Sequence, residues 1–217
     1  MVAQPDHDCP LCPRLVAYRM DNRVRFPGWH NGPVASFGDA DATLLIVGLA
    51  PGLKGANRSG RPFTGDVAGD LLYPTLIDFG LAKGRFAAEA DDGLQLIDCR
   101  ITNAVRCAPP QNKVTGPETA ACRPFLKSEI AQMKNLKTIL ALGVVAHGAV
   151  LTCLGEKKTA LPFAHGACHT LAGGLTLIDS YHCSRYNTNT GRLTVEMFND
   201  VFKTIVGEIR GDRLSRP

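Results

Sequence analysis

The chain has 217 residues, of which 45% are hydrophobic and 20% are charged, and its formal net charge is +4. This length suits one domain with a sizeable core, and the mild positive charge permits a polyanionic partner without requiring one. No run of about 18 apolar residues occurs, and the first residues lack a basic segment followed by an apolar one, so we expect neither a transmembrane helix nor a secretory signal.

Four short apolar runs predict the strands of the chain. Each run is nearly continuous in apolar residues, which is typical of parallel strands covered on both faces. Helical patterns separate the runs, so the sequence predicts an α/β fold, a three-layer α/β/α sandwich with a central four-stranded, mainly parallel sheet. We expect a single domain over residues 1–217, with an ordered core from about residue 8 to residue 210. The predicted strands cover residues 43–49, 94–104, 138–143 and 175–182.

Two of the predicted helices have clear start signals. The stretch 115–135 begins with the spacing of a capping box, Thr115 followed by Glu118. Pro124 lies inside this stretch, and we expect it to kink or restart the helix. The last helix is expected to begin after Thr194 as its N-cap. It carries one apolar stripe at helical spacing, formed by Phe198, Val201, Phe202, Ile205, Val206 and Ile209.

Four cysteines have a spacing that suits a metal group. Cys9 and Cys12 form a C-x-x-C pair, and Cys107 and Cys122 flank a proline-rich loop. Four thiolates from two distant segments can hold a [4Fe–4S] cluster or a structural zinc ion, and the spacing does not separate the two. Eight cysteines without an export signal indicate a reducing compartment, so we expect a cytoplasmic protein. We expect free thiols at Cys99, Cys153, Cys168 and Cys183.

The loop after the first predicted strand is rich in glycine and in basic residues. In α/β folds ligands bind beyond the carboxyl ends of the strands, and glycine lets the backbone approach a ligand closely. Neither G-K-[ST] nor G-x-G-x-x-G occurs, so no nucleotide-binding motif is indicated. The side chains that suit phosphate binding here are Lys54, Asn57, Arg58 and Arg61.

Several polar or aromatic residues in these loops have two interpretations. Phe63 either stacks on a planar ring or anchors its loop to the core. Asp66 is expected to cap the next helix, and it can also orient a water molecule or stabilise a cation. The polar segment 182–194 either grips an anionic ligand or is a solvated loop that caps the last helix.

Four segments together resemble the uracil-DNA glycosylase superfamily, and most of all its iron–sulfur-containing family 5. The resemblance extends over almost the whole chain and includes the four cysteines with metal-site spacing. The segments are GLAPG at 48–52, GANRSGRPFTGD at 55–66, ITNAVRCAPPQNK at 101–113 and HCSRYNTNTGRLT at 182–194. The resemblance implies a monofunctional DNA glycosylase that flips out uracil and hydrolyses its N-glycosidic bond, which initiates base excision repair.

The resemblance also implies a cofactor, a partner and a location. The cofactor is a structural [4Fe–4S] cluster held by Cys9, Cys12, Cys107 and Cys122. The partner is DNA that contains uracil or other deaminated bases such as hypoxanthine. We expect a monomer that is associated with the nucleoid in the cytoplasm.

The resemblance assigns roles to individual residues. Family 4 carries an acidic residue at the position of Leu49, which is apolar here, so the resemblance makes Asp66 the catalytic acidic residue. His182 faces the departing base. Phe63 stacks on the extruded base and Asn103 reads its edge. The base-binding set is Gly48, Leu49, Ala50, Phe63 and Asn103, and the DNA-binding set is Lys54, Asn57, Arg58, Ser184, Arg185, Asn187 and Arg192.

One departure from the family pattern concerns the segment after the last predicted strand. Cys183 stands between His182 and Ser184, where we expect relatives to carry a proline or an aliphatic residue. This substitution predicts a looser or redox-sensitive loop. Because Leu49 cannot act on water, a second hypothesis stays open, a non-catalytic protein that binds damaged DNA with the same fold. A thiol redox protein based on Cys9 and Cys12 is a third.

Overall fold

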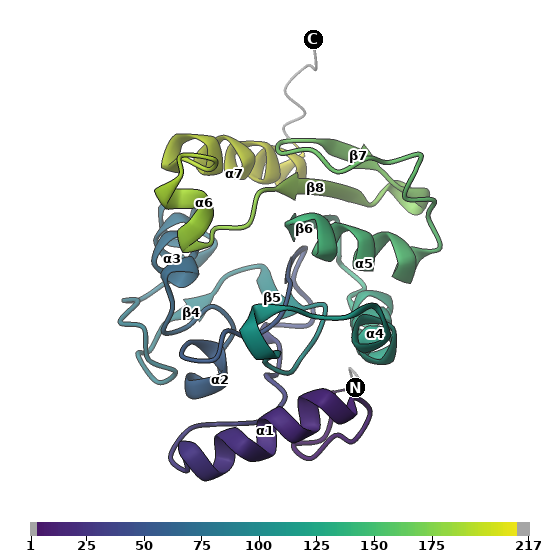
Figure 1. The fold of residues 1–217 in the computed structure, drawn as a ribbon. Coiled ribbons are helices and arrows are strands. Elements are labelled where there is room, and N and C mark those ends of the chain that lie inside the picture. The colour runs from purple at the N-terminus through teal and green to yellow at the C-terminus, as the bar shows by residue number, and fades with distance from the viewer. Residues whose placement is uncertain (1–3, 212–217) are drawn as a thin grey trace.

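The central sheet has four inner parallel strands, as the sequence predicts. The structure is a computed structural model that describes residues 4–211 (Figure 1). Every residue of the four inner strands is buried, and neighbouring inner strands pair in parallel. The inner strands, in their order across the sheet, are β5 (Cys99–Asn103), β2 (Leu44–Gly48), β6 (Thr138–Leu142) and β8 (Thr176–Ser180).

Two edge strands that the sequence analysis did not predict extend this sheet to six strands. β1 (Phe37–Gly38) pairs antiparallel with β5, and β7 (Cys168–Thr170) pairs antiparallel with β8. Both are too short to produce a periodic pattern. A separate two-stranded sheet contains β3 (Ala82–Lys83) and β4 (Gln95–Leu96).

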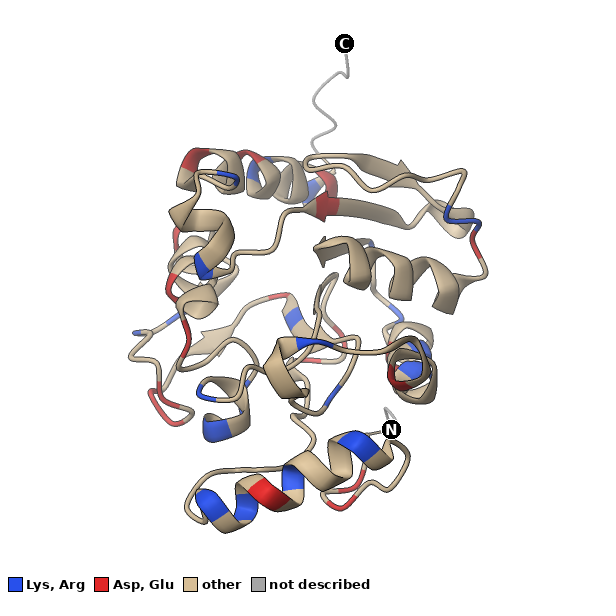
Figure 2. Cartoon of the chain, in the orientation of Figure 1, with Lys and Arg blue, Asp and Glu red and all other residues tan. Residues whose placement is uncertain are grey.

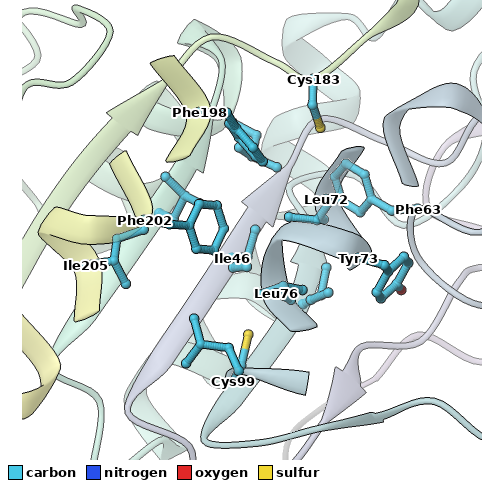
Figure 3. Close-up of a cluster of buried hydrophobic side chains, with 14 of the residues drawn as sticks. Ile46, Phe63, Leu72, Tyr73, Leu76, Cys99, Cys183, Phe198, Phe202 and Ile205 are labelled. Atoms are coloured by element: carbon cyan, nitrogen blue, oxygen red, sulfur yellow. The ribbon is translucent and has the colours of Figure 1, made fainter. Parts of the chain in front are cut away.

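Successive strand residues point into two different helical layers. Leu44 and Ile46 of β2 belong to a core cluster with α3 (Val67–Asp78) and α7 (Val195–Arg210), part of which is shown in Figure 3. The residue between them, Leu45, packs with α4 (Gly116–Gln132) and α5 (Val144–Leu154) on the other face. This alternation follows from the two-residue period of a strand and confirms the α/β/α sandwich.

The remaining helices are short or lie outside these layers. α1 (Pro13–Arg25) lies beside the sheet and is joined to α4 by Arg14, whose guanidinium donates to Glu118 at 2.7 Å (Figure 1). The short elements are α2 (Ala56–Ser59), η1 (Pro110–Asn112), η2 (Ala172–Gly174) and α6 (Arg185–Asn189). Within residues 4–211, no helix has the length and apolarity that crossing a bilayer requires.

The predicted helix starts are confirmed, and Pro124 does not restart the helix. The Thr115 hydroxyl accepts from the Glu118 N–H, and the Glu118 carboxylate accepts from the Thr115 N–H, which completes the capping box. Thr194 caps α7 by accepting from the Met197 N–H at 3.1 Å. α4 continues through Pro124, because Leu126 anchors its second half in the core and the proline removes only one N–H donor.

The predicted strand 94–104 is divided in two. Asp98 interrupts it with a φ of 49° between β4 and β5. Its carboxylate accepts from the Thr43 N–H at 2.7 Å and from the Thr43 hydroxyl at 2.6 Å. A short polar side chain tolerates this backbone region and bonds locally, so the chain turns here and enters the sheet only at Cys99.

A buried charge cluster ties β5 and the segment after it to α4. Glu129 is fully buried and accepts from Arg100 at 2.6 Å and from Arg106 at 2.5 Å. Arg106 also donates to the Ser36 hydroxyl at 2.6 Å. Burial pushes the pKa of Glu129 upward, but the two guanidinium groups outweigh it, so the pKa lies below the usual value and the residue stays ionised.

Replacing Glu129 with alanine should destabilise the protein by about 3–5 kcal/mol, because it leaves two buried guanidinium groups without their counter-ion. Urea unfolding measures the change. The matched control is Lys203→Ala, which breaks an exposed pair with Asp200 and should change stability by less than about 1 kcal/mol. A Glu129→Ala loss as small as that of the control would contradict the assigned role of this cluster.

Candidate active site

Loops that follow β2, β5 and β8 meet beyond the carboxyl end of the sheet. Five predicted site residues from these loops and strand ends line one small cavity, called here the inner cavity: Ala50, Phe63, Asp66, Asn103 and His182. Parallel strands end at the same edge of a sheet, so segments far apart in the sequence come together here. The expected convergence of these side chains is confirmed.

Gly48, the last residue of β2, makes room for two of these side chains. It pairs in register with Asn103 of β5. A Cβ at Gly48 would lie 2.4 Å from Asn103 Oδ1 and 2.6 Å from Phe63 Cζ. Both contacts are shorter than a carbon atom tolerates. The absence of a side chain at Gly48 therefore allows the Phe63 ring and the Asn103 amide to approach the same point.

The structure confirms that Phe63 anchors its loop to the core, and its role in stacking stays a prediction. It is only 6% exposed and belongs to the core cluster, where Figure 3 shows it beside Leu72. Its ring also lines the inner cavity and lies nearly parallel to the His182 ring, with 5.9 Å between centroids. Its φ of 52° lies in the left-handed region, which is uncommon for an aromatic residue. The core contacts of Phe63 thus hold its strained loop so that the ring lines the inner cavity.

Asp66 lies where the loop after β2 enters α3. Its carboxylate caps the helix by accepting from the Gly69 N–H at 3.3 Å, which confirms the predicted N-cap. A Cβ at Gly55 would lie 2.4 Å from Asp66 Oδ2, so this glycine also leaves space for the carboxylate. Burial raises the pKa of Asp66, and the helix N–H groups only partly oppose the shift.

His182 follows β8 and faces the same cavity. Burial lowers its pKa to about 4, so the imidazole is neutral near pH 7. Its Nδ1 atom is buried and has no hydrogen-bond partner within the described residues. The ring is therefore a neutral group beside the cavity with unused hydrogen-bonding capacity.

The inner cavity adjoins a wider groove of about 740 Å³, called here the outer groove. Asp66, His182 and Ala50 line both spaces, and Leu49 contributes to the groove. The groove is also lined by side chains that the sequence analysis did not select: Val144, Val145 and Tyr186. The two valines follow Gly143 at the carboxyl end of β6, which is the signal that could have identified them.

The loop after His182 is more ordered than the sequence suggested. Ser184 caps α6 by accepting from the Asn187 N–H at 3.4 Å, and the Asn187 amide donates to the His182 carbonyl at 2.8 Å. Cys183 is fully buried in the core beside Phe198, as Figure 3 shows. The burial of Cys183 contradicts a redox-sensitive thiol, and the expectation of a looser loop stays a prediction.

The predicted DNA-binding residues lie in three kinds of place: in the outer groove, elsewhere on the surface, or buried in the protein. Lys54, Ser184 and Arg185 line the outer groove. Arg192 is exposed, and its guanidinium lies over the Tyr181 ring at 4.6 Å. Figure 2 shows basic positions on α1, α2 and α6, and an acidic position on α1 between its basic ones.

Three residues of the glycine-rich loop pair with other parts of the protein. The Asn57 side chain is buried and donates to Asn31 Oδ1 at 2.9 Å, which removes it from the candidate DNA contacts. Arg61 is buried and forms two 2.8 Å hydrogen bonds with Asp92, so it does not suit phosphate binding. Arg58 is partly exposed and lies 3.6 Å from Glu89.

The four cysteines with metal-site spacing line a second, separate cavity. Cys9 and Cys12 lie before α1, Cys107 follows β5 and Cys122 lies in α4. Two N–H groups point at the sulfurs, from Arg106 to Cys122 at 3.3 Å and from Arg19 to Cys107 at 3.7 Å. Burial raises the pKa of Cys12 to about 11 and that of Cys107 to about 12, so these thiols stay protonated unless a metal compensates their charge.

The four cysteines converge on one cavity from distant segments of the chain, as both a structural zinc ion and an iron–sulfur cluster require. The two N–H groups that point at sulfur suit a metal-bound thiolate in either group.

Comparisons with known proteins agree with this fold and site. The model of the Uracil DNA glycosylase superfamily matches residues 35–206, so the chain is a member of that superfamily. It is 48% identical to the type-5 uracil-DNA glycosylase of Thermus thermophilus, over 89% of this chain and 90% of that relative. The type-5 uracil-DNA glycosylase of Pyrobaculum aerophilum is 40% identical, over 90% and 87% of the two chains. The chain belongs to the type-5 family, which confirms the resemblance.

Proposed function

We propose that this protein excises uracil from DNA by hydrolysing the N-glycosidic bond, as the first step of base excision repair. The observation that carries the proposal is the convergence of an aromatic ring, an amide, a carboxylate and an imidazole on one cavity beside a groove with basic side chains. The relatives of this family are named for the same activity. We also infer that residues 1–217 act as a single-domain monomer at the nucleoid.

Base recognition is assigned to Phe63 and Asn103. The Phe63 ring provides a stacking surface, and the Asn103 amide offers one donor and one acceptor, which matches the edge of uracil. A base in a duplex cannot reach this buried point, so it must leave the helix, which costs least for a mispaired base. Hypoxanthine presents a similar amide edge, so we propose uracil as the first substrate and other deaminated bases as weaker ones.

Bond cleavage is assigned to Asp66 and His182. The bond between the base N1 and the sugar C1′ breaks, the base leaves with the bonding electrons, and water adds to C1′ and gives up a proton. The sugar is cation-like in the transition state, so the Asp66 carboxylate stabilises it and orients the water. The neutral His182 ring donates a hydrogen bond to the base O2. Asp66 is the sole carboxylate among the described residues that line the inner cavity, and no lysine there suits Schiff-base attack.

DNA binding is assigned to the outer groove and to the segment Ser184–Arg192. Lys54, Arg185 and Arg192 contact phosphates, with Arg58 at the margin of the groove. Ser184 and Asn187 act mainly by holding the segment in place, because both bond within it. The segment enters the minor groove and fills the space that the extruded base leaves.

We propose that Cys9, Cys12, Cys107 and Cys122 hold a structural [4Fe–4S] cluster. The convergence of the four cysteines on one cavity and the two N–H groups that point at sulfur support this assignment. The cluster joins the N-terminal segment to α4 and to the segment after β5, and the inner cavity does not require it for chemistry.

Replacing Asp66 with asparagine should reduce uracil excision by at least about a hundredfold, because it removes the charge while keeping a good N-cap. Excision is measured on a U:G duplex, with hot alkali to cleave the product strand. DNA affinity, measured by fluorescence anisotropy, should stay within about twofold. Asp70→Asn, on the exposed side of the same helix, is the control. In the wild type, activity should fall as the pH drops through the raised pKa of Asp66.

Two outcomes would contradict this assignment. Near-normal excision by Asp66→Asn would remove Asp66 from the mechanism. A wild-type protein that binds the U:G duplex and leaves no alkali-labile site would support the non-catalytic damage-binding hypothesis instead.

Replacing Cys107 with serine should lower the bound iron and sulfide and remove the brown colour of the purified protein, because a buried ligand to the cluster is lost. Cys153→Ser is the matched control, since Cys153 is a buried cysteine outside the cavity. Iron content and visible absorbance measure the effect. Equal iron in both variants, or a colourless wild type with a reversible Cys9–Cys12 disulfide, would contradict the cluster.

A further inference from the structure

A group of side chains of the types that ligate metals lies apart from the cavities described above. His147 is in α5, His169 in β7 and Asp179 in β8, and one ligand atom from each lies within 4.8 Å of the others. His147 Nδ1 is 2.8 Å from Asp179 Oδ1, and His169 Nε2 is 3.2 Å from Asp179 Oδ2. Three separate elements supply these residues, so the fold and not a local sequence motif creates the cluster.

The hydrogen bond of His147 Nε2 fixes the protonation of that nitrogen, and this limits what can lie between Nδ1 and Asp179. Nε2 is 2.9 Å from the Leu161 carbonyl oxygen, which can only accept, so Nε2 carries a proton. In a neutral imidazole, Nδ1 then carries a lone pair, and it faces an oxygen of Asp179 at 2.8 Å. Either a proton, carried by the ring or by the carboxyl, or a metal ion must therefore lie between the two atoms.

The surroundings of Asp179 leave room for a cation among its partners. Its side chain is fully buried, and the ion pairs that it makes within residues 4–211 are with the two histidines and not with lysine or arginine. Buried charges are paired or coordinate a metal. The His169 side chain is 12% exposed, so an ion can reach the cluster from solvent.

We propose that His147, His169 and Asp179 bind a structural zinc ion. Two imidazole nitrogens and a carboxylate oxygen are ligands that zinc takes, and a water molecule completes the tetrahedron. The Leu161 carbonyl holds His147 by its other ring nitrogen, as backbone carbonyls do for zinc-bound histidines. Tetrahedral ligands at about 2.1 Å lie about 3.4 Å apart. The 2.8 Å and 3.2 Å contacts end on different oxygens of Asp179, so the carboxylate must turn to present one oxygen to an ion that both histidines also bind.

The position of the site indicates what the ion does. It joins β8 to the edge strand β7 on one side and to α5 on the other. Asp179 precedes His182 by three residues, so the ion fixes the end of the strand that carries His182 into the inner cavity. It touches neither the inner cavity nor the cysteines, and its effect is on stability.

Zinc titration of the full-length protein with its native iron content tests the proposal. The wild type should retain one zinc per chain after dialysis, with nitrogen and oxygen ligands and no sulfur in the X-ray absorption spectrum at the zinc edge. Added zinc should raise its melting temperature. His169→Gln should weaken zinc binding by at least about a hundredfold and abolish the thermal shift.

The matched control is His165→Gln, which alters a partly buried histidine of the neighbouring loop that contributes no ligand atom. It should bind zinc as the wild type does. The proposal would be overturned if the wild type held no zinc, which would leave a proton between His147 and Asp179. It would also be overturned if His169→Gln bound as much zinc as the wild type. Sulfur ligands would place the zinc at the cysteines and overturn it as well.

Discussion

The candidate active site depends on an absent side chain at the end of β2. Gly48 faces Asn103 across the parallel pair of β2 and β5, and a Cβ there would overlap both the Asn103 amide and the Phe63 ring. Only a residue without a Cβ lets an aromatic surface and a hydrogen-bonding edge meet at one point. The carboxylate of Asp66 and the ring of His182 then approach the same cavity from the loops beside it.

The cysteine cavity and the inner cavity are mechanically connected through one short segment. Arg106 lies between Asn103 and Cys107, its guanidinium binds Glu129, and its N–H points at Cys122. Whatever holds the cysteines together therefore also fixes the strand end that positions Asn103. This connection gives the cluster proposed at the cysteines a structural role outside the chemistry.

Apolar runs, helix caps and loop composition were sufficient to predict the inner strands, the starts of α4 and α7, and the loops that form the site. The rest depends on tertiary contacts that local patterns do not encode. Asn57 and Arg61 look like ligand contacts in sequence but are buried against Asn31 and Asp92. The two edge strands are too short to have a period, and the convergence of His147, His169 and Asp179 arises only when three elements pack.

Substituting alanine for Gly48 tests the central claim most directly. The single-turnover rate of uracil excision should fall by at least about a hundredfold, because the new methyl group displaces the Asn103 amide or the Phe63 ring. Gly28→Ala, where a Cβ meets nothing within 4 Å, should keep the wild-type rate. A folded Gly48→Ala protein that excises uracil at the wild-type rate would show that the base does not bind between Phe63 and Asn103.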